Sequence, residues 1–559
     1  MSVRNGVVLL LAVSTLLFLA ACGGNGNGPA TPVAPPSGAF SNSNLNGTYV
    51  FTISGIDANE APYAMAGTFT ANGSGGNGKG GITGGTFDIN DGTSSQFSAP
   101  AAGVSINNNS TYSVGTDGRG QAVIGTNIQS GTPGQSFPNL TFDFVLTDSS
   151  HGLITEFDGF GSGSGTLDLQ AANTTPTGTY AFSLSGANST GGSSWGTVGN
   201  FTVTGGTIAG LDDLNEGGVL AYANSTLTGA LVLGPSATPA TTLSIASNGS
   251  SVFNGTFDAI PIDGTHLKFI EMDATATLSG DAFSQTSATF PTGTLAFTLS
   301  GITTSNQLYA AGGFMSAAAS GAITGSEDYN LDGNLSSPSA PPAFSAAYTA
   351  GGTGRYTLGS FATFVGGTSY AAYPSSGGLL LLETDTSGIT FGAAYTQTPG
   401  AVLAASQGYG MNLAGVNLTG PTGSSPAEVD DIAEFTTVTG GTITGIIDEN
   451  FAPGNTGSGT LGIPLSSGTY GAIDSNGRFG ISATAATNNT ATLLGGFNLT
   501  AYAVDGTTFP FIESDSGQVS TGVVVLQNPS ASSPAIAHSH MFVVRPLIVP
   551  HAAAKKKTN

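Results

Sequence analysis

Cysteine is almost missing from this chain: Cys22 is the single one in 559 residues. This excludes a disulfide framework and a cysteine-based metal site, so the fold must rely on apolar burial and hydrogen bonds. Lysine and arginine are also scarce, 10 together against 33 aspartates and glutamates, for a formal net charge of −23. The part of the sequence expected to fold contains no basic patch, which argues against nucleic acid and against anionic partners.

Helical periodicity is missing as well, because after the first 21 residues no window of about a dozen positions repeats every 3.6 residues. What the chain has is glycine, 86 residues, together with 31 phenylalanines. A disordered Gly/Ser polymer would not carry so many phenylalanines. The composition therefore predicts many short strands joined by Gly-rich turns.

The N-terminal segment has one basic residue, Arg4, and then an uncharged apolar run over residues 6–18. These are the n-region and h-region of a secretory signal, and the run is too short for a comfortable membrane span. The following Leu19-Ala20-Ala21-Cys22 resembles the lipobox of bacterial lipoproteins. That resemblance implies that residues 1–21 are a signal peptide, that the Cys22 sulfur is acylated, and that lipid holds the protein outside the cytoplasm.

The residue after the cysteine is Gly23, not the aspartate that resembles inner-membrane retention in enteric bacteria. The resemblance therefore favours the outer membrane or the cell surface. Residues 22–44 are rich in Gly, Asn, Ser and Pro, which predicts a flexible tether. Residues 528–559 form a linker and a basic tail that ends near Lys555-Lys556-Lys557, for which an added edge strand, disorder or contact with anionic envelope phosphates are the alternatives.

Internal repeats organise the rest of the chain. The first landmark is an alternating strand, Gly-Thr-Tyr-x-Phe in its clearest form, at residues 47–55, 178–186, 293–301 and, more weakly, 407–415. The second is Gly-x-x-Asp-x-Asn, with its aspartate at Asp88, Asp213, Asp328 and Asp448. The third is Gly-Arg after a tyrosine and a turn, at Arg119, Arg355 and Arg478, with no copy in the second repeat. The fourth is Glu-x-Asp, starting at Glu156, Glu271, Glu383 and Glu513 and followed by Gln170, Gln285, Gln397 and Gln527.

These landmarks define four units, at residues 45–170, 177–285, 292–397 and 405–527. Each unit offers about eight short strands with one apolar face. The chain is therefore predicted to be all-β, with four tandem antiparallel β-barrel or β-sandwich units after the signal peptide and tether. A propeller with two blades per repeat is the third option. The short, proline-containing joints predict a stiff string of units.

Arginine is so rare in this chain that its recurrence at one repeat position indicates that the side chain has an acidic partner. We predict structural ion pairs within each unit, which would hold distant strands in register: Arg119–Glu156, Arg355–Glu383 and Arg478–Glu513. The second unit has Lys268 three residues before Glu271 instead. The alternative is that these arginines sit in solvent at the tips of turns.

The segment Asp328-Tyr329-Asn330-Leu331-Asp332-Gly333 matches the first half of a calcium-binding loop. Asp328, Asn330 and Asp332 are therefore weak candidate Ca²⁺ ligands, and no other cofactor is expected. The alternative is that these side chains cap a β-turn through their own backbone.

Catalytic sets are not expected. The spacing of Glu-x-Asp permits a glycosidase acid pair, but a pair present in all four units is more simply structural. The repeated strings resemble tandem Gly-rich β-repeat lipoproteins of the bacterial envelope, and this resemblance implies a lipid-anchored, non-enzymatic protein with a structural, adhesion or spacer role. The alternative is a lipoprotein that binds a glycan or small ligand in barrel interiors or at loop ends, which a pocket of about 300 Å³ or more would favour.

Overall fold

The computed structural model describes residues 34–531, apart from 59, 77, 93–99, 130–135, 172–174, 189–192, 233–240, 248–253, 338, 362–368, 421–425, 453–459 and 486–495. Within this part the chain forms 34 strands and one 3-10 helix, η1 (Asn42–Asn44). A search of the same residues finds no helix long and apolar enough to cross a membrane. Cys22 and the basic tail lie outside the described residues.

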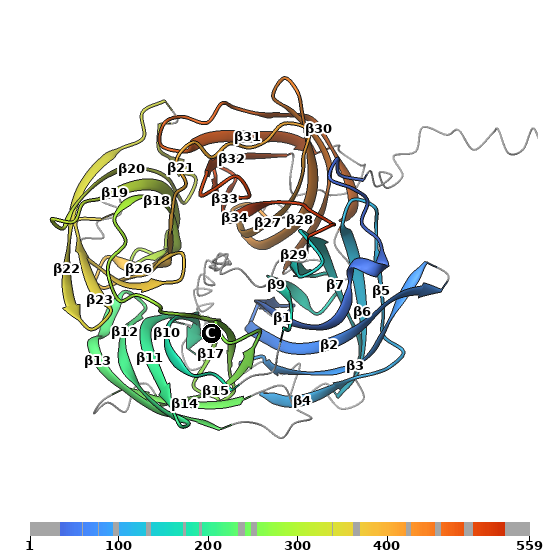
Figure 1. Ribbon diagram of the computed structural model, residues 1–559, viewed down its shortest axis with the longest axis horizontal. Helices are drawn as coiled ribbons and strands as arrows, with labels where there is room; N and C mark the ends of the chain where they lie inside the picture. The colour runs from blue at the N-terminus through green and yellow to red at the C-terminus, as the bar shows by residue number, and fades with distance from the viewer. Residues whose placement is uncertain are drawn as a thin grey trace, which may run out of the picture.

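The strands group into four antiparallel units, which we call barrels 1 to 4 (Figure 1). Barrel 1 contains β1 (Asn46–Asp57), β2 (Pro62–Gly76), β3 (Lys79–Asn90), β4 (Ala101–Ile106), β5 (Thr111–Val114), β6 (Arg119–Gln129), β7 (Ser136–Leu146), β8 (His151–Glu156) and β9 (Gly161–Leu169). Barrel 2 contains β10 (Gly178–Asn188), β11 (Ser194–Thr204), β12 (Thr207–Glu216), β13 (Val219–Val232), β14 (Thr241–Ser247), β15 (Asn254–Pro261), β16 (His266–Glu271) and β17 (Ala276–Ser284).

Barrel 3 contains β18 (Gly293–Thr303), β19 (Leu308–Ala317), β20 (Ala322–Leu331), β21 (Asn334–Leu335), β22 (Ala343–Gly352), β23 (Arg355–Gly359), β24 (Ser369–Ser375), β25 (Gly378–Glu383) and β26 (Gly388–Thr396). Barrel 4 contains β27 (Gly408–Asn417), β28 (Ala427–Val438), β29 (Thr442–Ala452), β30 (Thr460–Tyr470), β31 (Arg478–Ala485), β32 (Phe497–Tyr502), β33 (Thr508–Glu513) and β34 (Gln518–Leu526).

Each unit closes on itself. In barrels 2 and 4 the first strand pairs with the last, so eight strands form a closed up-and-down barrel. In barrels 1 and 3 the first strand also pairs with the last, and the pairings β2–β3 and β19–β20 complete the circuit. The all-β tandem-barrel prediction is confirmed, and the barrel is chosen over the sandwich because closure leaves no long open edge.

The alternating strand explains each core. In β1, Tyr49, Phe51 and Ile53 are buried in the barrel interior, and each adds about 1.5–3 kcal/mol of apolar burial. The glycine that ends this motif is required by close strand contact. A Cβ added to Gly186 or Gly301 would lie 1.7 or 1.9 Å from a carbonyl oxygen of the neighbouring strand.

One end of several barrels is filled by the segment that leads into the first strand. Phe40, Phe290 and Leu403 belong to the cores of barrels 1, 3 and 4 respectively, although they precede β1, β18 and β27. Phe290 stacks on Tyr348 with ring centroids 3.9 Å apart. The joints between barrels are therefore part of the packing, not free spacers.

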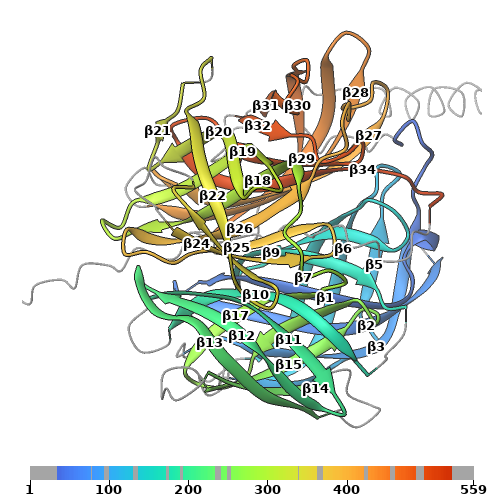
Figure 2. The same ribbon diagram turned by 60° about the vertical axis from the view of Figure 1, so that its left-hand side comes forward.

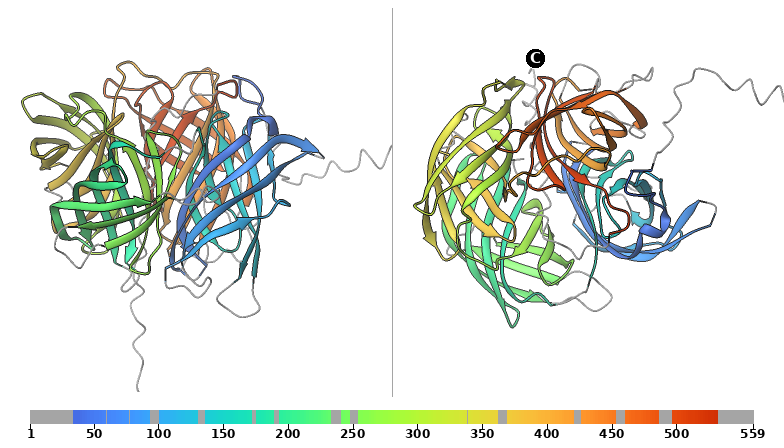
Figure 3. Two further views of the ribbon diagram at one scale, coloured as in Figure 1. Left: turned by 60° about the horizontal axis from the view of Figure 1, so that its bottom comes forward. Right: turned by 45° about the horizontal axis from the view of Figure 1, so that its top comes forward.

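The four barrels are arranged as a closed ring and not as a string (Figures 1 and 3). Barrel 1, in blue, lies against barrel 2 and also against barrel 4, in orange and red. Figure 2 shows the same packing from the side, with barrels 1 and 2 adjacent. The extended string predicted from the joints is thus replaced by a ring that joins the first and last units.

All four interfaces use the same faces. One barrel contributes its first strands and its neighbour contributes its last ones: β2 and β3 against β16 and β17, β10–β12 against β24–β26, β18–β20 against β32–β34, and β27–β29 against β7–β9. Such a head-to-tail contact forms a ring when the rotation between units closes. Here four units close it.

Candidate functional site

The Asp-x-Asn landmark lies at the interfaces, where its asparagine joins one barrel to the next. Asn330 Nδ2 donates to the backbone carbonyls of Glu513, Asp515 and Gln518 in barrel 4, at 3.2, 3.0 and 2.7 Å. The other copies reach the same segment of their neighbours: Asn90 to Glu271, Asp273 and Ala276; Asn215 to Glu383 and Gly388; Asn450 to Glu156 and Gly161. The repeated motif is a docking element.

The landmark arginines bind the aspartate of a neighbouring barrel. Arg355 donates to Asp213 at 2.7 and 2.6 Å, Arg478 to Asp328 at 2.6 and 2.8 Å, and Arg119 to Asp448 at 2.9 and 2.7 Å. All three are charge-assisted pairs that fix the docking geometry. Arg355 and Arg478 use two nitrogens each and are bidentate, whereas Arg119 reaches both oxygens of Asp448 through Nη1 alone.

The predicted pairs Arg119–Glu156, Arg355–Glu383 and Arg478–Glu513 are therefore wrong. Arg478 pairs in register with Tyr502, whose hydroxyl also reaches the neighbouring barrel's Asp328. Glu513 lies opposite Leu499, which faces the barrel interior. Arginine and glutamate thus lie on opposite faces of the barrel wall.

These contacts also bear on the calcium candidates. Asp328 accepts hydrogen bonds from Arg478 and Tyr502, and Asn330 Oδ1 accepts the backbone N–H of Gly333 at 3.0 Å. A calcium ion at Asp328, Asn330 and Asp332 would have to displace the arginine. Among the described residues no group of three or more His, Cys, Asp or Glu is arranged to hold a metal.

The second barrel, which lacks the arginine, joins barrel 1 through Lys268. Its Nζ lies 2.6 Å from Thr166 Oγ1 and 3.6 Å from Asp168 Oδ2 of barrel 1, and 2.8 Å from Asp281 Oδ1 of its own barrel. The Lys268 side chain is 1% exposed, so this cation is a buried link between the barrels.

The Glu-x-Asp pair is held inside each barrel. Burial raises the pKa of Glu271 to about 9 and that of Glu383 to about 7, and the nearby aspartate carboxyl adds to both shifts. The aspartates bond their own loop: Asp273 accepts the backbone N–H groups of Thr256 and Thr275. These contacts fit a structural carboxyl pair that closes the loop before the last strand.

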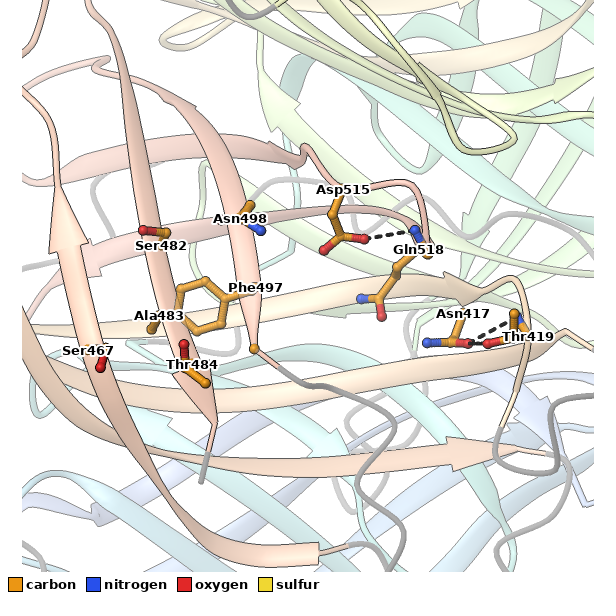
Figure 4. Close-up of a pocket in the computed structure, with 12 residues that line it drawn as sticks. Asn417, Thr419, Ser467, Ser482, Ala483, Thr484, Phe497, Asn498, Asp515 and Gln518 are labelled. Carbon is orange, nitrogen blue, oxygen red and sulfur yellow. Dashed lines mark hydrogen bonds between the residues drawn. The ribbon is translucent and has the colours of Figure 1, made fainter. Parts of the chain in front are cut away.

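A pocket of about 430 Å³ opens at one end of barrel 4 (Figure 4). Its walls are uncharged apart from Asp515, and carry hydroxyl and amide groups above the ring of Phe497. The lining comes from β27, β30, β31, β32, β34 and the loops next to them: Asn417, Thr419, Ser467, Ser482, Ala483, Thr484, Gly496, Phe497, Asn498, Asp515, Gly517 and Gln518. This volume is in the range of small-molecule sites.

An exchange of side chains distinguishes this end of barrel 4 from the same end of the other barrels. The position opposite the conserved strand glycine holds Tyr63, Trp195 and Tyr309 in barrels 1, 2 and 3, but Val429 in barrel 4. The three aromatic residues are at most 3% exposed and belong to their barrel cores. Val429 is smaller than these aromatic residues and is itself fully buried in the core of barrel 4.

The first residue of the last strand changes in the opposite sense. It is Gly161, Ala276 and Gly388 in barrels 1 to 3 and Gln518 in barrel 4. In barrel 1 a Cβ at Gly161 would lie 2.5 Å from the backbone carbonyl oxygen of Ile56 and 3.2 Å from the Tyr63 ring, so the neighbouring strand and the aromatic side chain together require a small residue. Gln518 is 1% exposed and lines the pocket, and neither atom of its amide has a hydrogen-bond partner among the described residues.

Two further acids face the interior of barrel 4. Asp431 pairs with Glu449 across β28 and β29, where the other barrels have Met65 with Ile89, Thr197 with Leu214, and Ala311 with Tyr329. Asp431 is fully buried, and neither of its oxygens has a hydrogen-bond partner within the described part of the chain. Burial raises the pKa of Asp431 well above its usual range, and the neighbouring Glu449 and Asp430 carboxyls raise it further.

Sequence reasoning missed this pocket. It located the repeats by what they share, whereas barrel 4 departs from the other barrels at Val429, Asp431 and Gln518, of which Gln518 lines the pocket. An alignment of the four repeats strand by strand would have shown these departures.

The fold and the site together define a ring of four β-barrels with a polar pocket in the fourth. No family model matches the chain, and no curated protein matches it. Transferrin binding protein B from serogroup B Neisseria meningitidis is 11% identical, over 68% of this chain and 84% of that one, with a TM-score of 0.19. The same protein from Haemophilus parasuis is 9% identical, over 67% and 83%, with a TM-score of 0.17. The P pilus usher PapC pore is 7% identical, over 87% and 99%, with a TM-score of 0.13. These scores are too low to assign a family or a ligand.

Proposed function

We propose that this protein is a lipid-anchored, non-enzymatic binding protein of the cell envelope, which holds a small polar ligand in the pocket of barrel 4. Cys22 is the proposed lipid attachment site, and the outer membrane or cell surface is the proposed location. The partner is a membrane through the lipid, and a polar small molecule or glycan through the pocket.

The pocket is the observation that carries the binding role. Its volume of about 430 Å³ lies within the range of about 300–1,000 Å³ that is usual for small-molecule sites. Hydroxyl and amide groups supply both donors and acceptors, which suits a hydroxyl-rich ligand. The buried, unpaired amide of Gln518 is costly in an empty protein and gains partners when a polar ligand binds.

A substitution that rebuilds barrel 1 in barrel 4 tests this role. The double variant Val429→Tyr with Gln518→Gly places an aromatic side chain over a glycine, as Tyr63 lies over Gly161. We expect the full-length protein in mild detergent to bind on a glycan and metabolite array and the double variant to lose that binding. Val429→Ile, which keeps the pocket, is the matched control. Equal binding by wild type and the double variant would place the ligand elsewhere and refute the role of the pocket.

The lipid anchor has its own experiment. Cells labelled with radioactive palmitate should incorporate label into the wild-type protein and none into the Cys22→Ser variant. Equal labelling of both proteins would remove Cys22 as the attachment site.

A structural or adhesion role is the second candidate, and the ring favours it. The landmark glutamines Gln170, Gln285, Gln397 and Gln527 also donate to backbone carbonyls of the next barrel. Together with the Asn and Arg contacts they join the barrels around the ring, which suits a spacer or a docking platform. An array without any hit, together with unchanged pocket variants, would favour this role over ligand binding.

A further inference from the structure

We infer that the ligand of the barrel 4 pocket carries a cationic amine. This inference rests on the proposed binding function and names its ligand class. It stands on the pocket, on the unpaired amide of Gln518 in its wall, and on Asp431 and Glu449, two acids on the interior face of barrel 4 whose equivalents in the other barrels are uncharged.

The charge at this end of barrel 4 is of one sign. Residues 405–527 contain ten acids and a single base, Arg478, which is taken up by Asp328 of barrel 3. Asp515 lines the pocket directly. An anionic ligand would meet only repulsion here, whereas a cation meets carboxylates in a medium of low dielectric constant.

The acids Asp431 and Glu449 are particular to barrel 4. The Glu-x-Asp pair is common to all barrels, but Asp431 and Glu449 replace apolar or uncharged residues at the equivalent positions of the other three. Asp431 lies near enough to Glu513 to raise the pKa of that carboxyl, after the larger effect of burial and of Asp515. Barrel 4 thus keeps a second buried carboxyl pair at the end where the pocket opens.

Hydrogen-bond chemistry points the same way. An ammonium group has three donors and no acceptor. The Asp515 carboxylate, the unpaired Gln518 carbonyl and the Asn498 amide carbonyl offer acceptors around the pocket (Figure 4). The Asn417 carbonyl is already taken up by Thr419 and Gly420. Burial raises the pKa of Asp431, and a cation bound nearby would lower that pKa again, so binding should release protons.

The test compares two probes that differ in this charge. Glucosamine and N-acetylglucosamine share one ring, but only the first carries an amine that is protonated at about pH 6.5. In calorimetric titrations of the full-length protein in mild detergent, we expect glucosamine to bind at least about tenfold more tightly. We also expect its apparent binding enthalpy to differ between buffers of different ionisation enthalpy, as proton release requires.

Two variants locate the effect. Asp431→Asn keeps the shape and removes the charge, and should reduce the preference for glucosamine about tenfold. Asp505→Asn removes the same charge from the β32–β33 turn, at the other end of barrel 4, and should leave the preference unchanged. Asp505 caps that turn through the backbone N–H groups of Thr507 and Thr508.

The outcomes separate this inference from the function on which it rests. Equal affinity for the two probes, or a preference that survives in Asp431→Asn, would overturn the inference that the ligand carries an amine. The pocket would remain a binding site. Absence of binding by both probes also overturns the inference of an amine. The array experiment with the Val429→Tyr, Gln518→Gly variant then decides the binding function by itself.

Discussion

Replacing Arg119 with methionine should open the ring between its first and last barrels. Arg119 Nη1 donates to both oxygens of Asp448 at 2.9 and 2.7 Å, and its Nε lies 3.0 Å from Asp117 Oδ2. The arginine side chain is 11% exposed and the aspartates 5% and 0%. Methionine keeps the apolar stem of arginine and removes only the charged head.

The magnitude follows from the burial. Removing one member of a buried ion pair costs about 3–5 kcal/mol, because the partner charge is left without compensation. A cost of about 3 kcal/mol shifts the balance between closed and open ring by more than a hundredfold, at about 1.4 kcal/mol per factor of ten. Unlike the other three interfaces, this one joins barrels that are not consecutive in the chain, so its loss separates them.

Small-angle X-ray scattering and urea denaturation give the two readouts. The variant should show a larger radius of gyration and a free energy of unfolding lower by about 3 kcal/mol. Arg478→Met, at the interface of consecutive barrels 3 and 4, is the control and should lose stability with little expansion. Adding Asp448→Leu to Arg119→Met should recover much of the loss, since two apolar partners replace the pair. An unchanged radius of gyration with a loss below about 1 kcal/mol would refute the reasoning.

Three further predictions follow from the same contacts. The melting temperature should fall as the pH rises from about 4.5 towards 9. In the folded state the pKa of Glu271 is about 9 and that of Glu434 about 8, so the folded chain binds more protons than the unfolded one over this range. A melting temperature that rises over this range would contradict the prediction. Lys268→Met should lower the free energy of unfolding, measured by urea denaturation, by about 3–5 kcal/mol, because it leaves buried aspartates without a compensating charge between barrels 1 and 2. A loss below about 1 kcal/mol would show that the lysine is dispensable. Calcium or a chelator should change the melting temperature by less than about 1 °C, because Arg478 occupies Asp328; a rise of several degrees with calcium would restore the calcium site.

The barrel units could be predicted from the sequence because their cores follow from the alternation of apolar and polar residues along single strands. Tyr49, Phe51 and Ile53 alternate along one strand, and the same alternation returns in each repeat. Closure into barrels follows from the number of sequential strands and from the cost of an open edge. These features depend on neighbours within one unit.

The docking role of the landmark residues could not be predicted from the sequence, because the repeats are equivalent to one another. When every unit carries the same arginine and the same acids, the sequence cannot tell whether Arg355 binds an acid of its own unit or of another. Both choices repeat equally well, and only the assembled ring shows that Asp213 is the partner. The same ambiguity hid the closed ring, since a contact between barrels 1 and 4 has no signature at the joints.

The ring has a consequence for how this gene can change over evolutionary time. In an open repeat array, a duplicated unit adds one more link and each unit touches only its neighbours. Here the last barrel already occupies the docking face of the first, through Asn450 and Gln527. A fifth barrel would find no free docking face in the ring, and the loss of one barrel would leave two docking faces uncovered. The number of repeats is therefore fixed, and divergence of a single copy, as in barrel 4, is the route left open for acquiring something new.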